Sequence, residues 1–73
     1  MQSTDVMIHI NESLDEASQQ EIESELRSIK GVIAPRFNKL HLLVVAYDAE
    51  LTSSPALLKH VIGKGYHAQL IGL

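Results

Sequence analysis

Apolar and polar side chains alternate along Val6–Ile10, and the apolar ones are β-branched. A period of two with β-branched residues predicts a strand that buries one face and leaves the other open. We therefore expect Val6 and Ile8 to face the core, and Met7 and His9 to lie together on the open face.

The next segment predicts a helix. Ser13 and Glu16 form a capping box, in which the Ser hydroxyl caps the helix start and the Glu lies three residues on. The helix is expected to run to about Lys30, and Gly31 is placed to end it. Its buried stripe recurs at steps of four, four and three: Ser18, Ile22, Leu26 and Ile29.

Two strands are predicted in the middle of the chain. The first, Val32–Phe37, contains Pro35, which cannot donate a ladder hydrogen bond and so places the strand at a sheet edge. A tight turn at Asn38–Lys39 follows. The next strand, Leu40–Tyr47, is almost continuously apolar, which predicts a central position in the sheet.

A second helix and a last strand complete the chain. Ser54 is expected as the N-cap, with Pro55 in the first turn and Gly63 at the end. The expected buried stripe is Leu57, Leu58, Val61 and Ile62. The segment Tyr66–Leu73 is predicted to be a strand with His67, Gln69 and Ile71 on the open face.

The order of these elements predicts one ferredoxin-like βαββαβ domain over residues 1–73. Such a domain closes as a four-stranded antiparallel sheet with both helices on one face. The first and third strands are expected at the centre, and the second and fourth at the edges.

Composition narrows the possible functions. The chain has 73 residues, a net charge of −3 and no cysteine. The charge argues against a nucleic-acid partner, and the missing cysteines exclude disulfides and thiolate chemistry. No apolar run is long enough to enter a membrane, and the N-terminus lacks a signal peptide, so we expect a cytoplasmic protein. We also expect no cofactor and no enzymatic activity, because serines sit where helices begin and no nucleophile has a base in reach.

Three segments together resemble one known family. They are Ile22-Glu23-x-x-Leu26-x-x-Ile29-x-Gly31-Val32, then Val45-x-Tyr47-Asp48, then Ser54-Pro55 through Lys64-Gly65-Tyr66-x-Ala68. In this order and spacing they are similar to the heavy-metal-associated domains of copper chaperones and metal-transporting ATPases. The resemblance covers nearly the whole chain and implies the same fold.

The metal motif of that family is absent. The resemblance places its two cysteines at Asp15 and Ser18, and its closing loop at Tyr66. Oxygen ligands hold soft Cu(I) poorly, so the transfer of metal that the resemblance implies is not expected here. The sequence predicts a binding or interaction module that has lost its thiolate site.

Histidine offers an alternative metal chemistry. By strand parity His9 and His67 both face the open side of the sheet, on strands expected to be neighbours, with Met7 nearby. They could hold Zn(II) or Cu(II), but two imidazoles make only half of a tetrahedral site. Amphipathic residues on a half-exposed surface explain the same pattern. A metal-binding protein using His, Asp or Met ligands, with Asp15 as a further candidate, therefore stays an alternative.

The open face of the sheet is the leading candidate for function. It is expected to carry an apolar cluster: Met7, His9, Leu42, Val44 and Ile71. Exposed apolar patches on small domains often mark interfaces, although scattered surface aliphatics are also common. We expect this face, with one of the edge strands, to bind a protein partner or a second copy of the chain. A small-ligand sensor formed on dimerisation is a third hypothesis.

Overall fold

Six elements follow one another in the predicted order, in a computed structural model that describes residues 2–71. The strands and helices are β1 (Ser3–Ile10), α1 (Glu16–Arg27), β2 (Val32–Lys39), β3 (Leu42–Asp48), α2 (Ser54–Gly63) and β4 (Ala68–Ile71). The ferredoxin-like βαββαβ prediction is therefore confirmed.

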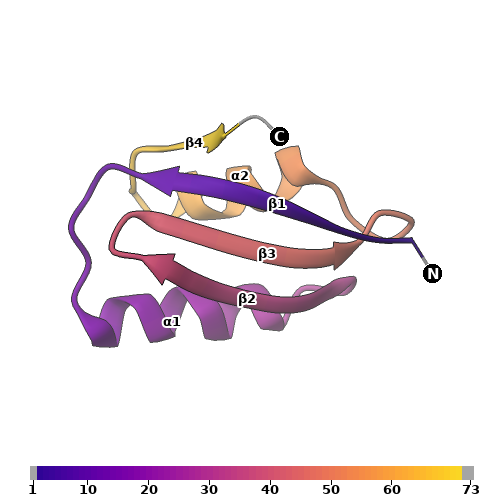
Figure 1. Cartoon of the computed structure of the whole chain (residues 1–73), viewed down its shortest axis with the longest axis horizontal. Coiled ribbons are helices and arrows are strands. Elements are labelled where there is room, and N and C mark those ends of the chain that lie inside the picture. Colours follow the sequence, from indigo (N-terminus) through magenta and orange to yellow (C-terminus); the bar gives the residue numbers. More distant parts are fainter. Residues whose placement is uncertain (1, 72–73) are drawn as a thin grey trace.

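The four strands form one antiparallel sheet in the order β2-β3-β1-β4. The predicted central and edge positions are thus confirmed. Figure 1 shows the strands side by side in this order, with both helices behind the sheet. One sheet face is covered and the other is open, so alternate residues of each strand have opposite environments.

The core lies between the sheet and the helices. Val6, Ile8 and Ile10 are buried, whereas Met7 and His9 are only half-buried. The register predicted for this strand is therefore correct, because a slip of one residue would have exchanged the two sets. The other buried apolar residues are Leu14, Ile22, Leu26, Leu43, Val45, Tyr47, Leu57 and Val61.

Both helices begin elsewhere than predicted. Asp15, not Ser13, caps α1: its Oδ1 accepts a hydrogen bond of 2.8 Å from the main-chain N of Ser18. Leu14, between the two candidate caps, is buried, and Ser13 is exposed. Ser53, not Ser54, caps α2. Serine and aspartate are both strongly preferred at the N-cap, so residue type alone does not choose between the candidates.

The second helix buries a narrower stripe than predicted. Leu57 and Val61 are fully buried, but Ile62 is 46% exposed. Ile62 lines a hollow together with Ala68 and Gln69 of β4, the last strand of the sheet. Within residues 2–71 the sheet ends at β4 on this side, and the Ile62 side chain stays open to solvent.

Candidate interaction surface

The five residues predicted to share the open face lie in register across three strands. Met7 of β1 is the Cα partner of Val44 on β3 and of Ile71 on β4, and His9 is the partner of Leu42. Directly opposite residues of an antiparallel pair share a face, so the five side chains form one group. All five are half-buried. We call this group the open-face cluster: Met7, His9, Leu42, Val44 and Ile71.

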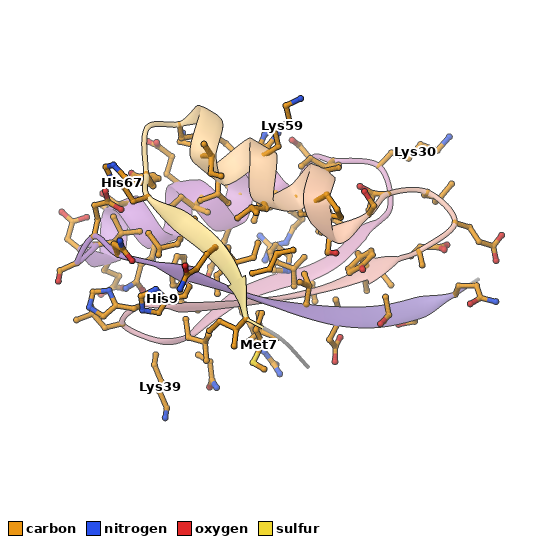
Figure 2. All side chains as sticks on the ribbon, turned by 90° about the horizontal axis from the view of Figure 1, so that it is seen from above. Met7, His9, Lys30, Lys39, Lys59 and His67 are labelled. Carbon is orange, nitrogen blue, oxygen red and sulfur yellow. The ribbon has the colours of Figure 1, made fainter. Side chains whose placement is uncertain are left out.

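Two cations border the open-face cluster along β2. Arg36 lies opposite Val44, and Lys39 lies opposite Leu42. Both are exposed, and Figure 2 shows Lys39 projecting from the side of the sheet away from the helices. The sequence does not indicate this rim, because β2 has register shifts between Val32 and Ala34 and between Phe37 and Lys39. Such shifts break the period of two on which face assignment depends.

His9 has an unpredicted neighbour. Its ring stacks on that of His41, with ring centroids 5.7 Å apart. The Nδ1 of His41 lies 2.9 Å from the carbonyl of Ile10 and 3.1 Å from that of Glu12, so it carries the proton and donates. The Nδ1 of His9 is buried and has no hydrogen-bond partner. His41 therefore anchors the loop after β1 and packs against the edge of the open-face cluster.

His67 is engaged with Glu12. The Glu12 carboxylate accepts hydrogen bonds from the main-chain N and the ring Nδ1 of His67, at 2.9 and 2.7 Å. These bonds hold the pKa of Glu12 below its ordinary value. His67 precedes β4, which begins at Ala68, so strand parity does not govern its side chain. Figure 2 shows its ring apart from that of His9.

The positions that correspond to the family's metal loop serve helix α1 instead. Asp15 and Ser18 are joined by the capping hydrogen bond, which also lowers the pKa of the Asp15 carboxyl. Tyr66 is half-buried and packs against the core. A carboxylate and a hydroxyl are hard oxygen ligands, so these residues do not fit a soft ion such as Cu(I). Within residues 2–71 no group of three or more His, Cys, Asp or Glu is arranged to hold a metal ion.

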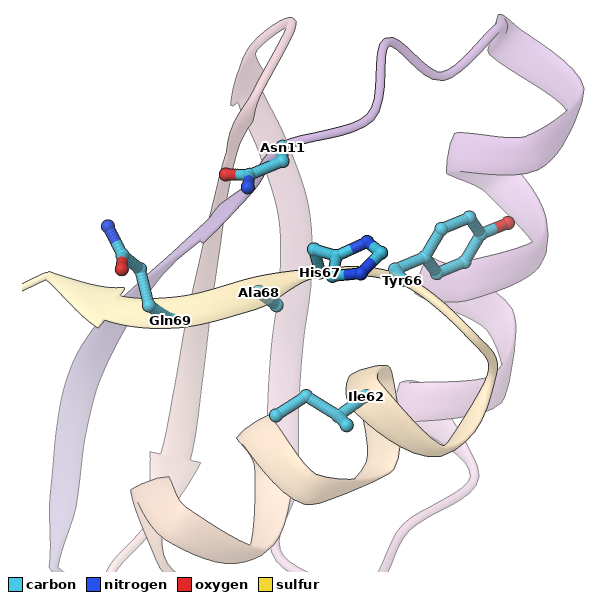
Figure 3. Close-up of a pocket in the computed structure, with 6 residues that line it drawn as sticks. All are labelled: Asn11, Ile62, Tyr66, His67, Ala68 and Gln69. Carbon is cyan, nitrogen blue, oxygen red and sulfur yellow. The ribbon is translucent and has the colours of Figure 1, made fainter.

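A shallow hollow lies where β4, α2 and the loop after β1 meet. Figure 3 shows Ile62 of α2 on one side of it and Asn11 on the other. The remaining lining residues are Tyr66, His67, Ala68 and Gln69. The sequence does not indicate this hollow, because Asn11 is distant along the chain from Ile62 and from the residues that follow α2.

Several solved structures have the same fold. The N-terminal domain of a potential copper-translocating P-type ATPase from Bacillus subtilis, in the Cu(I)-loaded state, matches with a TM-score of 0.85 and 27% identity over 96% of this chain and 89% of that one. Oxidized MerP from Ralstonia metallidurans CH34 matches with a TM-score of 0.83 and 18% identity, over 96% of this chain and 99% of that one. A copper binding domain from HMA7, a P-type ATPase, matches with a TM-score of 0.83 and 16% identity over 93% of each chain.

The chain has the fold of the heavy-metal-associated domains. The resemblance found in the sequence is thereby confirmed, and so is the absence of the two-cysteine motif. No family model matches the chain, and no curated protein matches it. In the part of the chain that the structure describes, no helix is long and apolar enough to cross a membrane.

Proposed function

We propose that this domain is a non-catalytic protein-interaction module that keeps the heavy-metal-associated fold without its thiolate chemistry. The observation that carries the proposal is the open-face cluster, in which four apolar residues and His9, from three strands, lie in register and are half-buried. The fold provides a rigid sheet, and the side chains on its open face are free to contact a partner.

The rim of the cluster indicates the kind of partner. Arg36 and Lys39 of β2 lie opposite Val44 and Leu42. On β1 the open face carries one carboxylate, that of Asp5, which lies opposite Ala46. An apolar patch bordered by carboxylates complements this surface, because charges on an interface rim choose the partner and steer its approach. The proposed occupant is therefore a partner protein with an acidic rim.

A photo-crosslinking amino acid at Val44 tests this assignment in cells that make the protein. The proposal expects a protein adduct at position 44, none at the exposed Ser24 of α1, and loss of the adduct when Leu42→Lys is added. Mass spectrometry identifies the adduct. Adducts of equal yield at both positions, or none at position 44, would contradict the proposal.

Self-association is distinguished by analytical ultracentrifugation. A dimer that Leu42→Lys dissociates would replace the partner protein with a second copy of the chain. If the wild-type protein is monomeric at all concentrations, self-association through this face is excluded.

Metal binding through histidine is the alternative function, and the stacked rings of His9 and His41 are the observation that favours it. Titration with Zn(II), Cu(II) and Ni(II), followed by amide chemical shifts, separates it from the proposal. Stoichiometric shifts around His9, His67 or Asp15 would support a metal site. The interaction module predicts no such shifts at these three residues.

A further inference from the structure

The His9 side chain is held by three neighbouring residues. Across the sheet it lies between its Cα partners, Leu42 of β3 and Gln69 of β4. Its ring also stacks on that of His41, which is itself fixed by contacts of 2.9 and 3.1 Å with two main-chain carbonyls. None of these three neighbours carries a carboxylate, so none of them offers His9 a charged hydrogen-bond acceptor.

The two ring nitrogens of His9 have different surroundings. Nδ1 is buried and has no hydrogen-bond partner, whereas the residue as a whole is only half-buried, so Nε2 is the nitrogen that is open to solvent. In folded proteins a buried N–H without an acceptor is rarer than a buried acceptor without a donor. The proton of the neutral ring therefore belongs on Nε2, and His9 offers a donor to whatever covers the open face.

Two cations on the same face have no counter-charge. Lys39, Leu42 and His9 lie opposite one another across β2, β3 and β1, and Arg36 lies opposite Val44 beside them. Both cations are exposed, and within residues 2–71 neither forms an ion pair. Figure 2 shows Lys39 at the same end of the sheet as His9.

These groups together select a carboxylate as the group that binds beside His9. A carbonyl oxygen could accept from Nε2 but would leave Lys39 without a counter-charge, whereas a carboxylate satisfies both. Asp5, the carboxylate on the open face of β1, cannot reach this place. It is four residues from His9 along the strand, which is roughly 13 Å at the rise of a β-strand.

We infer that an Asp or Glu side chain of the partner protein binds at the His9 end of the open-face cluster. It accepts a hydrogen bond from Nε2 of His9 and pairs with Lys39. His41 is a positioning residue, because its stacking fixes the His9 ring. The inference rests on the proposed function and deepens it, since it names the group recognised and the residues that recognise it.

The position of the His9 proton is measured on the free domain labelled with nitrogen-15. Spectra that correlate ring nitrogens with ring C–H protons distinguish the two tautomers. At about pH 8, where ordinary histidine side chains are neutral, His9 should carry its proton on Nε2 and His41 on Nδ1. A His9 proton on Nδ1 would overturn the inference, because the nitrogen open to solvent would then be an acceptor.

Two amide substitutions at His9 test the contact in cells, with the photo-crosslinking amino acid at Val44. His9→Gln places an amide N–H near the position of Nε2, whereas His9→Asn places the same group one carbon shorter. The yield of the adduct should stay within about twofold of the wild type in His9→Gln. It should fall about tenfold in His9→Asn, which loses a hydrogen bond to a charged group. Equal yields in the two variants would overturn the inference.

Lys39 is tested against a matched lysine. Lys39→Gln removes the charge beside His9 and should lower the adduct yield about threefold or more. Lys30→Gln is the control, because Lys30 is exposed at the opposite end of the molecule (Figure 2), and it should leave the yield unchanged. Mass spectrometry should find an Asp or Glu in the crosslinked segment of the partner. Equal effects of the two lysine variants, or a segment without a carboxylate, would contradict the inference.

These measurements separate the inference from the proposed function. A wild type without an adduct at position 44 removes both. An adduct that forms as well in His9→Phe as in the wild type keeps the interaction surface and removes the carboxylate contact. An adduct between two copies of this chain would also overturn the inference. The tautomer and the crosslinked segment are measured on the wild-type His9, so they test the inference even if a substitution fails to fold.

Discussion

The Glu12 carboxylate holds His67 by two hydrogen bonds, 2.9 Å from its main-chain N and 2.7 Å from its ring Nδ1. The two residues are separated by 55 positions along the chain. With the bond from Asn11 to the His67 carbonyl, they join the loop after β1 to the start of β4. These hydrogen bonds hold the loop after β1 against the last strand of the sheet.

This contact predicts how stability depends on pH. Hydrogen bonds from His67 lower the pKa of Glu12 in the folded state, so the ionised carboxylate favours folding. Its contribution is present above the ordinary pKa of glutamate in the unfolded chain, and is lost as pH falls through the lowered folded value. Urea unfolding of wild type and Glu12→Gln should therefore differ near neutral pH and converge in acid.

The control for that prediction is the variant His67→Ala, in which the pKa of Glu12 is measured by following its carboxyl carbon signal as pH is changed. Removal of the ring and its hydrogen bond should move the pKa of Glu12 up toward its ordinary value. A Glu12 pKa that is the same with and without the His67 ring would contradict the role given to this pair.

The cap of α1 makes a second prediction. Asp15→Ala removes the acceptor for the Ser18 N–H and should lower the free energy of unfolding. Ser13→Ala touches no cap and should stay within about 0.5 kcal/mol of the wild type. Chemical denaturation measures both, and Asp15→Asn, which keeps an acceptor, should retain most of the stability. Equal losses at positions 13 and 15 would restore Ser13 as a contributor to the helix start.

Two neighbouring residues of β3 test the two-faced sheet. Leu43 is fully buried, and Leu43→Ala should cost about 2–5 kcal/mol of unfolding free energy because it leaves a cavity. Val44 lies on the open face and is half-buried, so Val44→Ala should cost less than about 1 kcal/mol. Urea denaturation gives both values. A reversed order would mean that the strand faces the other way.

Glycine substitutions separate backbone strain from crowding. Gly31 has φ of +100°, and an added Cβ would lie 2.7 Å from the Cβ of Leu51. Gly31→Ala should therefore cost more than about 2 kcal/mol. Gly65 has φ of +101°, but a Cβ added there would meet no atom within 4 Å. Gly65→Ala should therefore lower the free energy of unfolding by about 1–2 kcal/mol, from backbone strain alone. Gly63→Ala meets neither obstacle and should change stability by less than about 1 kcal/mol; thermal unfolding ranks the three.

The sequence by itself determined the element order and the faces of the strands. Alternation along Val6–Ile10 fixes which side chains are buried, because a strand has a period of two and only one face is covered. Pro35 placed β2 at an edge for an equally local reason, the missing N–H. The open-face cluster followed from this parity, and its five members do lie in register. Its role as an interface stays a prediction.

Tertiary structure decided everything that depends on which distant groups meet. Asp15 and not Ser13 caps α1 in the folded chain. The turn before β3 brings His41 against His9, and closure of the sheet brings Glu12 to His67. The two register shifts in β2 placed Arg36 and Lys39 beside the cluster. Local patterns encode which face a residue takes within its own element. They carry no information on the neighbour across a loop, because packing of the whole chain sets that contact.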